Sequence, residues 1–402
     1  MSNRYIAGRV TNYISPLEVP DAPASATATG GDASASVAFT APSNVGASAI
    51  TSYSVVASSG GTVATGASSP ITVTGLTNGT PYTFQVAATN SYGIGPIITT
   101  NSVTPATPTG VQKAIFGYGQ SGTAVSTTNL VSSTGVVAAN TTGVGTARYA
   151  LAAAGYGNDK AIFGYGNDGS VGNVSISNLV SNTGVVATDT TGVGTARSSL
   201  AAATYGTDKA IFGYGNGGGL TSITNKVSNT GVVSADTTGV GTARQGPAAA
   251  SYGSSGQAIF GYGQSSGSVS VSITNLVSNT GVVSSDTTGV GTSRWVLAAA
   301  GYGGDKAIFG YGDTGGFTYS SLTNLVSNTG VVATDTAGVG TARLRIAAST
   351  YGANKAIFGY GYASAGDVSM TNLVSSTGVV STDTTGVGTA RNYLAAAGYS
   401  LT

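Results

Sequence analysis

The chain from Lys113 to Thr402 repeats one pattern of short apolar runs separated by glycine-rich turns. The string Ala-Ile-Phe-Gly-Tyr-Gly occurs six times in this part, beginning at Ala114, Ala161, Ala210, Ala258, Ala307 and Ala356. Successive copies lie 47, 49, 48, 49 and 49 residues apart. Because a repeat of this length is one supersecondary unit that packs against its neighbours, the period decides the fold.

Each repeat contains four apolar runs of strand length. In the second copy they cover residues 149–155, 160–165, 178–181 and 185–190, with turns at 157–159 and 182–184. Short apolar runs between glycine and asparagine turns are typical of antiparallel strands. Four strands in each period predict one blade of a β-propeller, so the six repeats predict six blades.

The two ends of the repeated region are complementary. The first repeat starts with a second strand at Lys113, and the last repeat ends with an additional first strand at 394–399. We expect residues 394–399 to pair with 113–118, complete the first blade and close the ring without an open edge.

The repeat resembles the blade of a kelch-type propeller. Kelch blades carry an arginine before their first strand and a glycine pair after their second, and Arg197 and Gly213–Gly215 match these features. The repeat departs from the family in its Gly-Tyr-Gly sequence and in lacking the tryptophan of the fourth strand. The resemblance covers residues 113–402 and implies a kelch-like six-bladed propeller.

Residues 17–106 do not share the period and contain short alternating strands at 36–39, 50–56, 71–73 and 82–88. This region resembles a fibronectin type III domain, an immunoglobulin-like β-sandwich, at 20–23, 39–42, 50–53 and 90–96. Leu76 followed by Tyr82 is similar to the tyrosine corner of such sandwiches. Phe39 stands where the family usually has tryptophan.

The remaining segments are an N-terminal arm, residues 1–16, and a linker, residues 107–112. The arm lacks the apolar stretch of a secretory signal peptide. Its apolar residues, Ile6, Val10, Tyr13 and Ile14, are compatible with a frayed tail or with a docking segment that becomes ordered on a partner.

Composition excludes several classes of function. The net charge is +1 without a basic tract, which argues against nucleic acid as a partner. No apolar stretch is long enough for membrane insertion. Histidine and cysteine are absent and Glu18 is the only glutamate. We therefore expect no catalytic residue, metal site or cofactor, and no enzymatic activity.

The loops between the second and third strands differ among the repeats, whereas the loops that lead into each first strand are nearly identical. Propeller geometry places both sets on one face, and variation on a rigid scaffold is typical of a recognition surface. Neutral drift in solvent is the alternative. The candidate recognition residues in these variable loops are Asp168, Leu220, Phe317, Tyr319 and Tyr362.

An arginine recurs before every first strand, and an aspartate precedes it by eight residues in five repeats. Asn140 replaces the aspartate in the first repeat. Such a ring of arginines either holds the blades together or binds an anion; their recurrence with the scaffold favours the structural role. The ring comprises Arg148, Arg197, Arg244, Arg294, Arg343 and Arg391.

The chain has a low content of charged residues, no cysteine, and β repeats rich in glycine, serine, threonine and alanine. In these features it resembles bacteriophage tail-fibre and decoration proteins. The resemblance implies a non-enzymatic structural or adhesive virion protein, assembled in the host cytoplasm and carried on the extracellular particle. Its expected partners are other virion proteins, through the arm, and a host surface glycan or protein; a homo-oligomer is left open. The alternative is a bacterial cell-surface or secreted carbohydrate-binding propeller.

Overall fold

The computed structural model describes residues 18–399 except 32–33, 78 and 106–111. The chain divides into two units between residues 109 and 110, and both are built from β-strands. The predicted arm with Ile6, Val10, Tyr13 and Ile14 lies outside the described residues, as does most of the predicted linker. No helix in the described part of the chain is long and apolar enough to cross a membrane.

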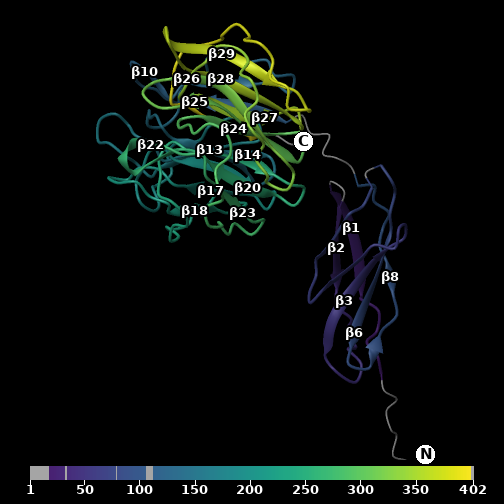
Figure 1. Ribbon diagram of the computed structural model, residues 1–402. Helices are drawn as coiled ribbons and strands as arrows, with labels where there is room; N and C mark the ends of the chain where they lie inside the picture. Colours follow the sequence, from purple (N-terminus) through teal and green to yellow (C-terminus); the bar gives the residue numbers. More distant parts are fainter. Residues whose placement is uncertain (1–17, 32–33, 78, 106–111, 400–402) are drawn as a thin grey trace, which may run out of the picture. The chain divides into compact units, whose positions relative to one another are not determined.

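The first unit consists of two facing sheets (Figure 1). One sheet has the strand order β1-β2-β5, and the other has the order β4-β3-β6-β7 with β8 paired to β6. The bounds are β1 Ser25–Gly31, β2 Ser34–Thr40, β3 Ile50–Ala57, β4 Val63–Gly66, β5 Ile71–Thr74, β6 Phe84–Asn90, β7 Gly93–Ile94 and β8 Ile98–Thr99.

Alternation of buried and exposed side chains explains how these strands form a sandwich. In β2, Ala35, Val37 and Phe39 are buried while their neighbours are not, and they pack with Phe84 of β6. The backbone N–H of Thr77 donates to the hydroxyl oxygen of Tyr82 (3.1 Å), the contact expected of a tyrosine corner.

The second unit contains six three-stranded antiparallel sheets with nearly identical registers. Their strands, in sheet order, are β30 (Ala395–Tyr399), β9 (Lys113–Gly117) and β12 (Thr128–Val131); β13 (Ala152–Tyr156), β14 (Lys160–Gly164) and β15 (Ser177–Val180); β16 (Ala201–Tyr205), β17 (Lys209–Gly213) and β18 (Thr224–Val227); β19 (Ala248–Tyr252), β20 (Gln257–Gly261) and β23 (Thr274–Val277); β24 (Ala298–Tyr302), β25 (Lys306–Asp313) and β26 (Tyr319–Val326); β27 (Ala347–Tyr351), β28 (Lys355–Ala363) and β29 (Gly366–Val374).

The loops of this unit contain two further short hairpins and one turn of 3₁₀ helix. They are β10 (Gln120–Ser121) with β11 (Thr123–Ala124), β21 (Gln264–Ser265) with β22 (Val269–Ser270), and η1 (Ser266–Ser268).

The predicted fourth strand of each repeat does not form a regular ladder. In the second repeat the outer segment joins β15 through two isolated bridges, Val180 to Val186 and Ser177 to Thr190. Between them the side-chain amide of Asn178 donates to the carbonyl oxygen of Ala187 (3.0 Å). A side chain thus takes the place of a backbone donor, which interrupts the ladder.

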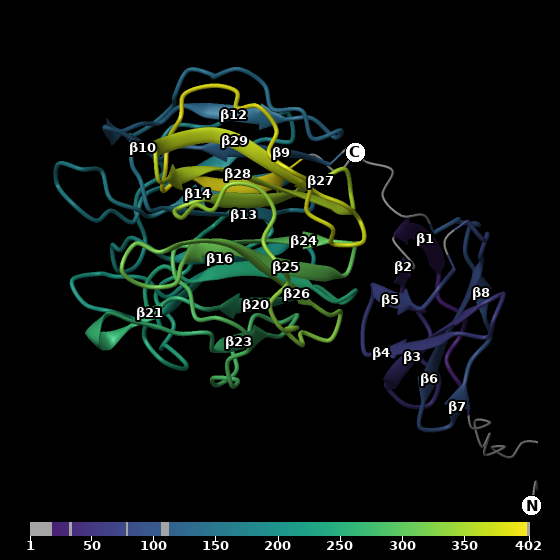
Figure 2. The same cartoon turned by 45° about the horizontal axis from the view of Figure 1, so that its top comes forward.

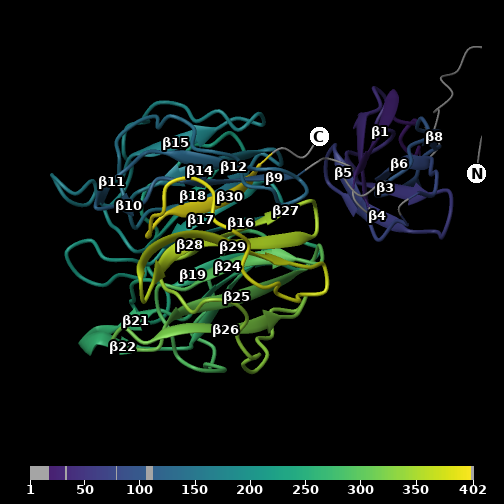
Figure 3. The same cartoon turned by 90° about the horizontal axis from the view of Figure 1, so that it is seen from above.

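The six sheets follow one another in a cycle. The first strands lie side by side in the order β13, β16, β19, β24, β27 and β30, and β30 lies beside β13 again. In Figure 2 the yellow strands β28 and β29 lie near the blue strands β9 and β12, and Figure 3 shows β30 beside β9. Ala395 pairs with Gly117 and Tyr399 with Lys113, as the ends of the repeated region predicted.

The recurring Phe-Gly-Tyr sequence packs each sheet against the next. The Phe163 ring of one sheet lies 5.1 Å from the Tyr118 ring of the preceding sheet, measured between centroids. A Cβ atom on Gly117 would come within 2.6 Å of Phe163, so only glycine leaves room for that ring. The same contact joins Phe116 to Tyr360 across the meeting point of first and last sheets (5.2 Å).

A closed ring of six backbone hydrogen bonds surrounds the centre of this cycle. The residues lie two positions after each recurrent arginine, and each donates its N–H to the carbonyl oxygen of the previous one over 2.7–3.0 Å. All six have positive φ; that of Val296 is 46°, a strained value for a β-branched residue. This axial ring consists of Ala150, Ser199, Gly246, Val296, Arg345 and Tyr393.

Removing residues 391–402 should destabilise the second unit and promote aggregation. The deletion takes away β30, which leaves one edge of β9 without its partner and breaks the axial ring at Tyr393. Thermal unfolding and light scattering of the truncated and full-length chains measure the effect. A truncated chain that melts at the same temperature and remains monomeric would contradict this account of closure.

Candidate functional site

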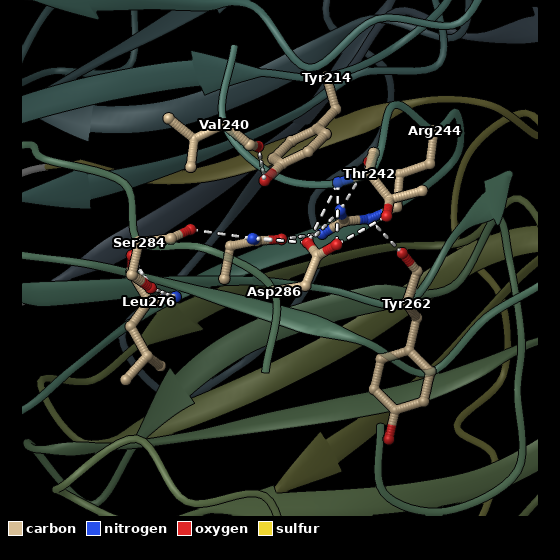
Figure 4. A network of polar contacts seen from close by, with 9 residues as sticks. Tyr214, Val240, Thr242, Arg244, Tyr262, Leu276, Ser284 and Asp286 are labelled. Carbon is tan, nitrogen blue, oxygen red and sulfur yellow. Dashed lines mark hydrogen bonds and ion pairs between the residues drawn. The ribbon is translucent and has the colours of Figure 1, made fainter. Parts of the chain in front are cut away.

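The recurrent arginines lie between neighbouring sheets, and all six side chains are fully buried. Arg244 shows the arrangement in Figure 4. Its guanidinium carbon lies 4.0 Å from the centroid of the Tyr214 ring on one sheet, while Nε donates to the carbonyl oxygen of Tyr262 on the next (2.7 Å). Two further bonds reach the carbonyl oxygen of Thr242 (3.1 Å) and Oδ1 of Asn275 (2.8 Å).

Where an acid lies beside a recurrent arginine, it belongs to the following repeat rather than to the position eight residues earlier. Asp286 lies 4.0 Å from Arg244 and accepts hydrogen bonds from the backbone and hydroxyl of Thr242 and from Asn275. The equivalent ion pairs are Arg148–Asp189, Arg294–Asp335 and Arg343–Asp383. The shared network therefore connects consecutive repeats.

In the first repeat an amide replaces the carboxylate without breaking the network. Oδ1 of Asn140 accepts from the backbone of Thr389 (3.2 Å), and its Nδ2 donates to the Thr389 hydroxyl (2.7 Å). These contacts join residues at opposite ends of the repeated region. The arginine contacts favour a structural role over anion binding, since the guanidinium groups are fully buried, lie over tyrosine rings and donate most of their hydrogen bonds to protein acceptors.

Burial and hydrogen bonding act in opposite directions on the acids of this network. Burial would raise the pKa of Asp286, but hydrogen bonds from Thr242 and Asn275 and the charge of Arg244 outweigh it and hold the pKa below its ordinary value. Burial lowers the pKa of Arg244, which still carries its charge at neutral pH. Burial also raises the pKa of Tyr262 to about 12.

The candidate recognition residues differ in how they are held. Phe317 is 62% exposed at the tip of the β25–β26 hairpin, while Leu220 is half-buried. Tyr319 and Tyr362 lie in strands β26 and β28 rather than in loops, and their rings stack with centroids 6.3 Å apart. Asp168 uses its carboxylate to accept the N–H groups of its own loop, residues 170–172.

The sequence analysis missed a second variable set on the same face. The two residues after each recurrent arginine differ in every repeat, within loops that are otherwise nearly identical, and this difference was visible in the sequence. The first positions are Tyr149, Ser198, Gln245, Trp295, Leu344 and Asn392; the second positions form the axial ring. The axial ring residues line a shallow depression at the centre of the cycle.

The charged groups of the arginine network are used for hydrogen bonds within the protein. Within the described residues, no three His, Cys, Asp or Glu side chains lie together in a way that could hold a metal ion. The acids of the arginine network are occupied by hydrogen bonds that recur in each repeat.

Comparison with known proteins identifies one domain. Residues 21–103 match the family model for the fibronectin type III domain, which confirms the resemblance seen in the sequence. No curated protein matches the chain. The first unit thus contains a fibronectin type III domain.

Replacing Arg244 with alanine should lower the free energy of unfolding by about 3 kcal/mol, because buried acceptors on Tyr262, Thr242 and Asn275 lose their donor. Denaturant unfolding of the second unit measures this change. Arg345→Ala is the matched control, since Arg345 is partly exposed and forms no ion pair among the described residues. Equal effects of the two substitutions would contradict a special structural role for Arg244.

Asp286→Asn should cost about 1 kcal/mol at pH 7, because charge-assisted hydrogen bonds become neutral ones while Asn140 shows that the amide fits. The folded-state pKa of Asp286 lies below the unfolded value of about 3.9, so its contribution is present above that pH and is lost as pH falls further. The difference between the denaturant midpoints of the variant and the wild type should therefore be smaller at about pH 3 than at pH 7.

Asp159→Asn serves as the control for this measurement, since Asp159 pairs only with its neighbour Lys160 at the surface. A stability difference for Asp286→Asn that stayed constant down to about pH 3 would disprove the electrostatic explanation.

Proposed function

We propose that the second unit is a six-bladed, kelch-like β-propeller. The cyclic order of the six sheets, the β30–β9 pairing and the axial ring support this proposal. The outer segment of each repeat would be the irregular fourth strand of its blade. Removal of residues 391–402, described above, tests the proposal.

We further propose that the chain is a non-enzymatic structural and adhesive protein of a bacteriophage virion, of the tail-fibre or decoration type. Residues 1–16 attach it to other virion proteins, the fibronectin type III domain acts as a spacer, and the propeller presents its variable face to a host surface or a neighbouring virion protein. The observation that carries the proposal is the concentration of partly exposed aromatic residues on one face of an otherwise repetitive scaffold.

Weak binding at each copy would be sufficient for this function. Aromatic side chains such as the highly exposed Phe317 offer large contact areas at low entropic cost. Many copies on one particle bind together, so their joint affinity exceeds that of a single contact by orders of magnitude.

A bacterial cell-surface or secreted carbohydrate-binding propeller is the second candidate. The stacked rings of Tyr319 and Tyr362 favour it, because flat aromatic surfaces suit the apolar faces of sugars. Immunogold labelling of the chain in lysates of infected cells and on purified particles distinguishes the two locations.

Replacing Phe317, Tyr319 and Tyr362 together with serine should leave particle assembly intact and reduce attachment to host cells at least about tenfold, since the exposed aromatic contacts are lost. Adsorption assays with purified particles measure the change. Val171→Ser, at a highly exposed position in another variable loop, is the control and should attach normally.

A chain without residues 1–16 should fold but fail to join the particle. Normal incorporation of this chain, or unchanged adsorption of the triple variant, would contradict the division of labour proposed here.

A further inference from the structure

The residues that follow the recurrent arginines make the centre of the variable face asymmetric. Ser198, Ser199, Gln245 and Gly246 are small or polar and occupy one side of the axial ring. The other side carries aromatic residues and one additional arginine, Arg345, which has no counterpart in the other repeats. In repeats that otherwise match closely, this departure requires an explanation that the scaffold does not supply.

Aromatic rings and Arg345 form a continuous cluster on that side. The guanidinium carbon of Arg345 lies 4.4 Å from the centroid of the Tyr393 ring and 5.8 Å from that of Tyr362. The ring centroids of Tyr393 and Tyr149 lie 6.1 Å apart, and the Tyr362 ring stacks on the Tyr319 ring. All five side chains are partly exposed, and Arg345 and Tyr393 line the central depression.

Arg345 differs from the six buried arginines in being partly exposed. Its Nε has no hydrogen-bond partner, and among the described residues it forms no ion pair. The carboxylates nearby are occupied: Asp313 accepts from the Trp295 indole (3.2 Å) and from its own loop, and Asp367 accepts from Asn392 (2.6 Å). The partly exposed side chain of Arg345, held against two aromatic rings, can therefore present its terminal N–H groups to a ligand.

The backbone beneath the cluster is held in place before any ligand arrives. Arg345 donates its N–H to Val296 (2.8 Å) and accepts from Tyr393 (3.0 Å), so both backbone polar groups are used by the axial ring. Binding at this site therefore needs no ordering of the backbone at Arg345.

We propose that Arg345, Tyr393 and Tyr149 form a carbohydrate-binding site at the centre of the variable face. A pyranose ring stacks its apolar face on Tyr393, and neighbouring hydroxyl oxygens accept the paired donors of Arg345. Sugar chemistry fits this surface better than a peptide, because the depression is shallow and combines flat rings with a planar donor fork. The inference rests on the proposed function in one respect, namely that the variable face serves for recognition.

Fluorescence of Trp295, the only tryptophan of the chain, gives a direct test because Trp295 adjoins the axial ring residue Val296. The full chain is titrated with cellohexaose, chitohexaose and hexagalacturonate. At least one of these probes should change the emission with a Kd of about 1 mM or below. Arg345→Ala and Tyr393→Ala should each weaken that binding at least about tenfold.

Ser199→Ala is the matched control. All three substitutions place alanine in the axial ring, where Ala150 already has the same backbone conformation, so folding should be preserved. Ser199→Ala should bind within about twofold of wild type, since it lies opposite the cluster. No response to any probe at roughly 10 mM, or unchanged binding by both cluster variants, overturns the proposal.

The outcome is separable from that of the proposed function. Oligosaccharide binding that depends on Arg345 would sustain this site even if the Phe317, Tyr319 and Tyr362 variant attached normally to cells. Loss of attachment by that variant, with no oligosaccharide bound by the wild type, would sustain recognition and overturn the carbohydrate site.

Discussion

A buried guanidinium group between two neighbouring sheets is the contact on which the second unit depends. Removing such a charge from water costs several kcal/mol unless its donors are satisfied. Arg148, Arg197 and Arg244 each donate to two backbone carbonyls and to an asparagine. Because the tyrosine beneath each arginine belongs to the preceding sheet, one side chain fixes the spacing of two sheets. The loops that carry this network therefore tolerate little change, which explains their near identity.

Periodicity allowed much of the architecture to be predicted. The approximate positions of the first, second and third strands follow from the apolar runs, although the first strand begins at Ala152 rather than at Tyr149. The pairing of β30 with β9 follows from the unmatched ends of the repeated region. The fourth strand was predicted from an apolar run of strand length after a turn. The hydrogen bond from the Asn178 side chain to the carbonyl oxygen of Ala187 cannot be read from a hydrophobic pattern. The aspartate that pairs with an arginine could not be predicted from the sequence either, because it belongs to the next repeat.

The candidate surface was predicted only in part, for a related reason. The variable loops between the second and third strands pointed to Phe317 and Tyr362. The two variable residues after each arginine were overlooked because they follow a loop that is nearly identical in all repeats. Their proximity becomes visible only when the cycle brings Tyr149 and Tyr393, which lie at opposite ends of the repeated region, to within 6.1 Å. Chemistry assembled from different repeats in this way has no local signature in the sequence.

The axial ring has a consequence for how such a chain can evolve. Repeats this similar invite unequal recombination, which adds or removes whole copies of the coding segment. Six N–H groups that each donate to the preceding carbonyl form a cycle of one size, and every member adopts a positive φ to do so. A chain with five or seven copies would have to form this cycle at another radius, with different angles at each hydrogen bond. The number of repeats is therefore constrained at the centre of the molecule, while the residues that form the ring remain free to differ in their side chains.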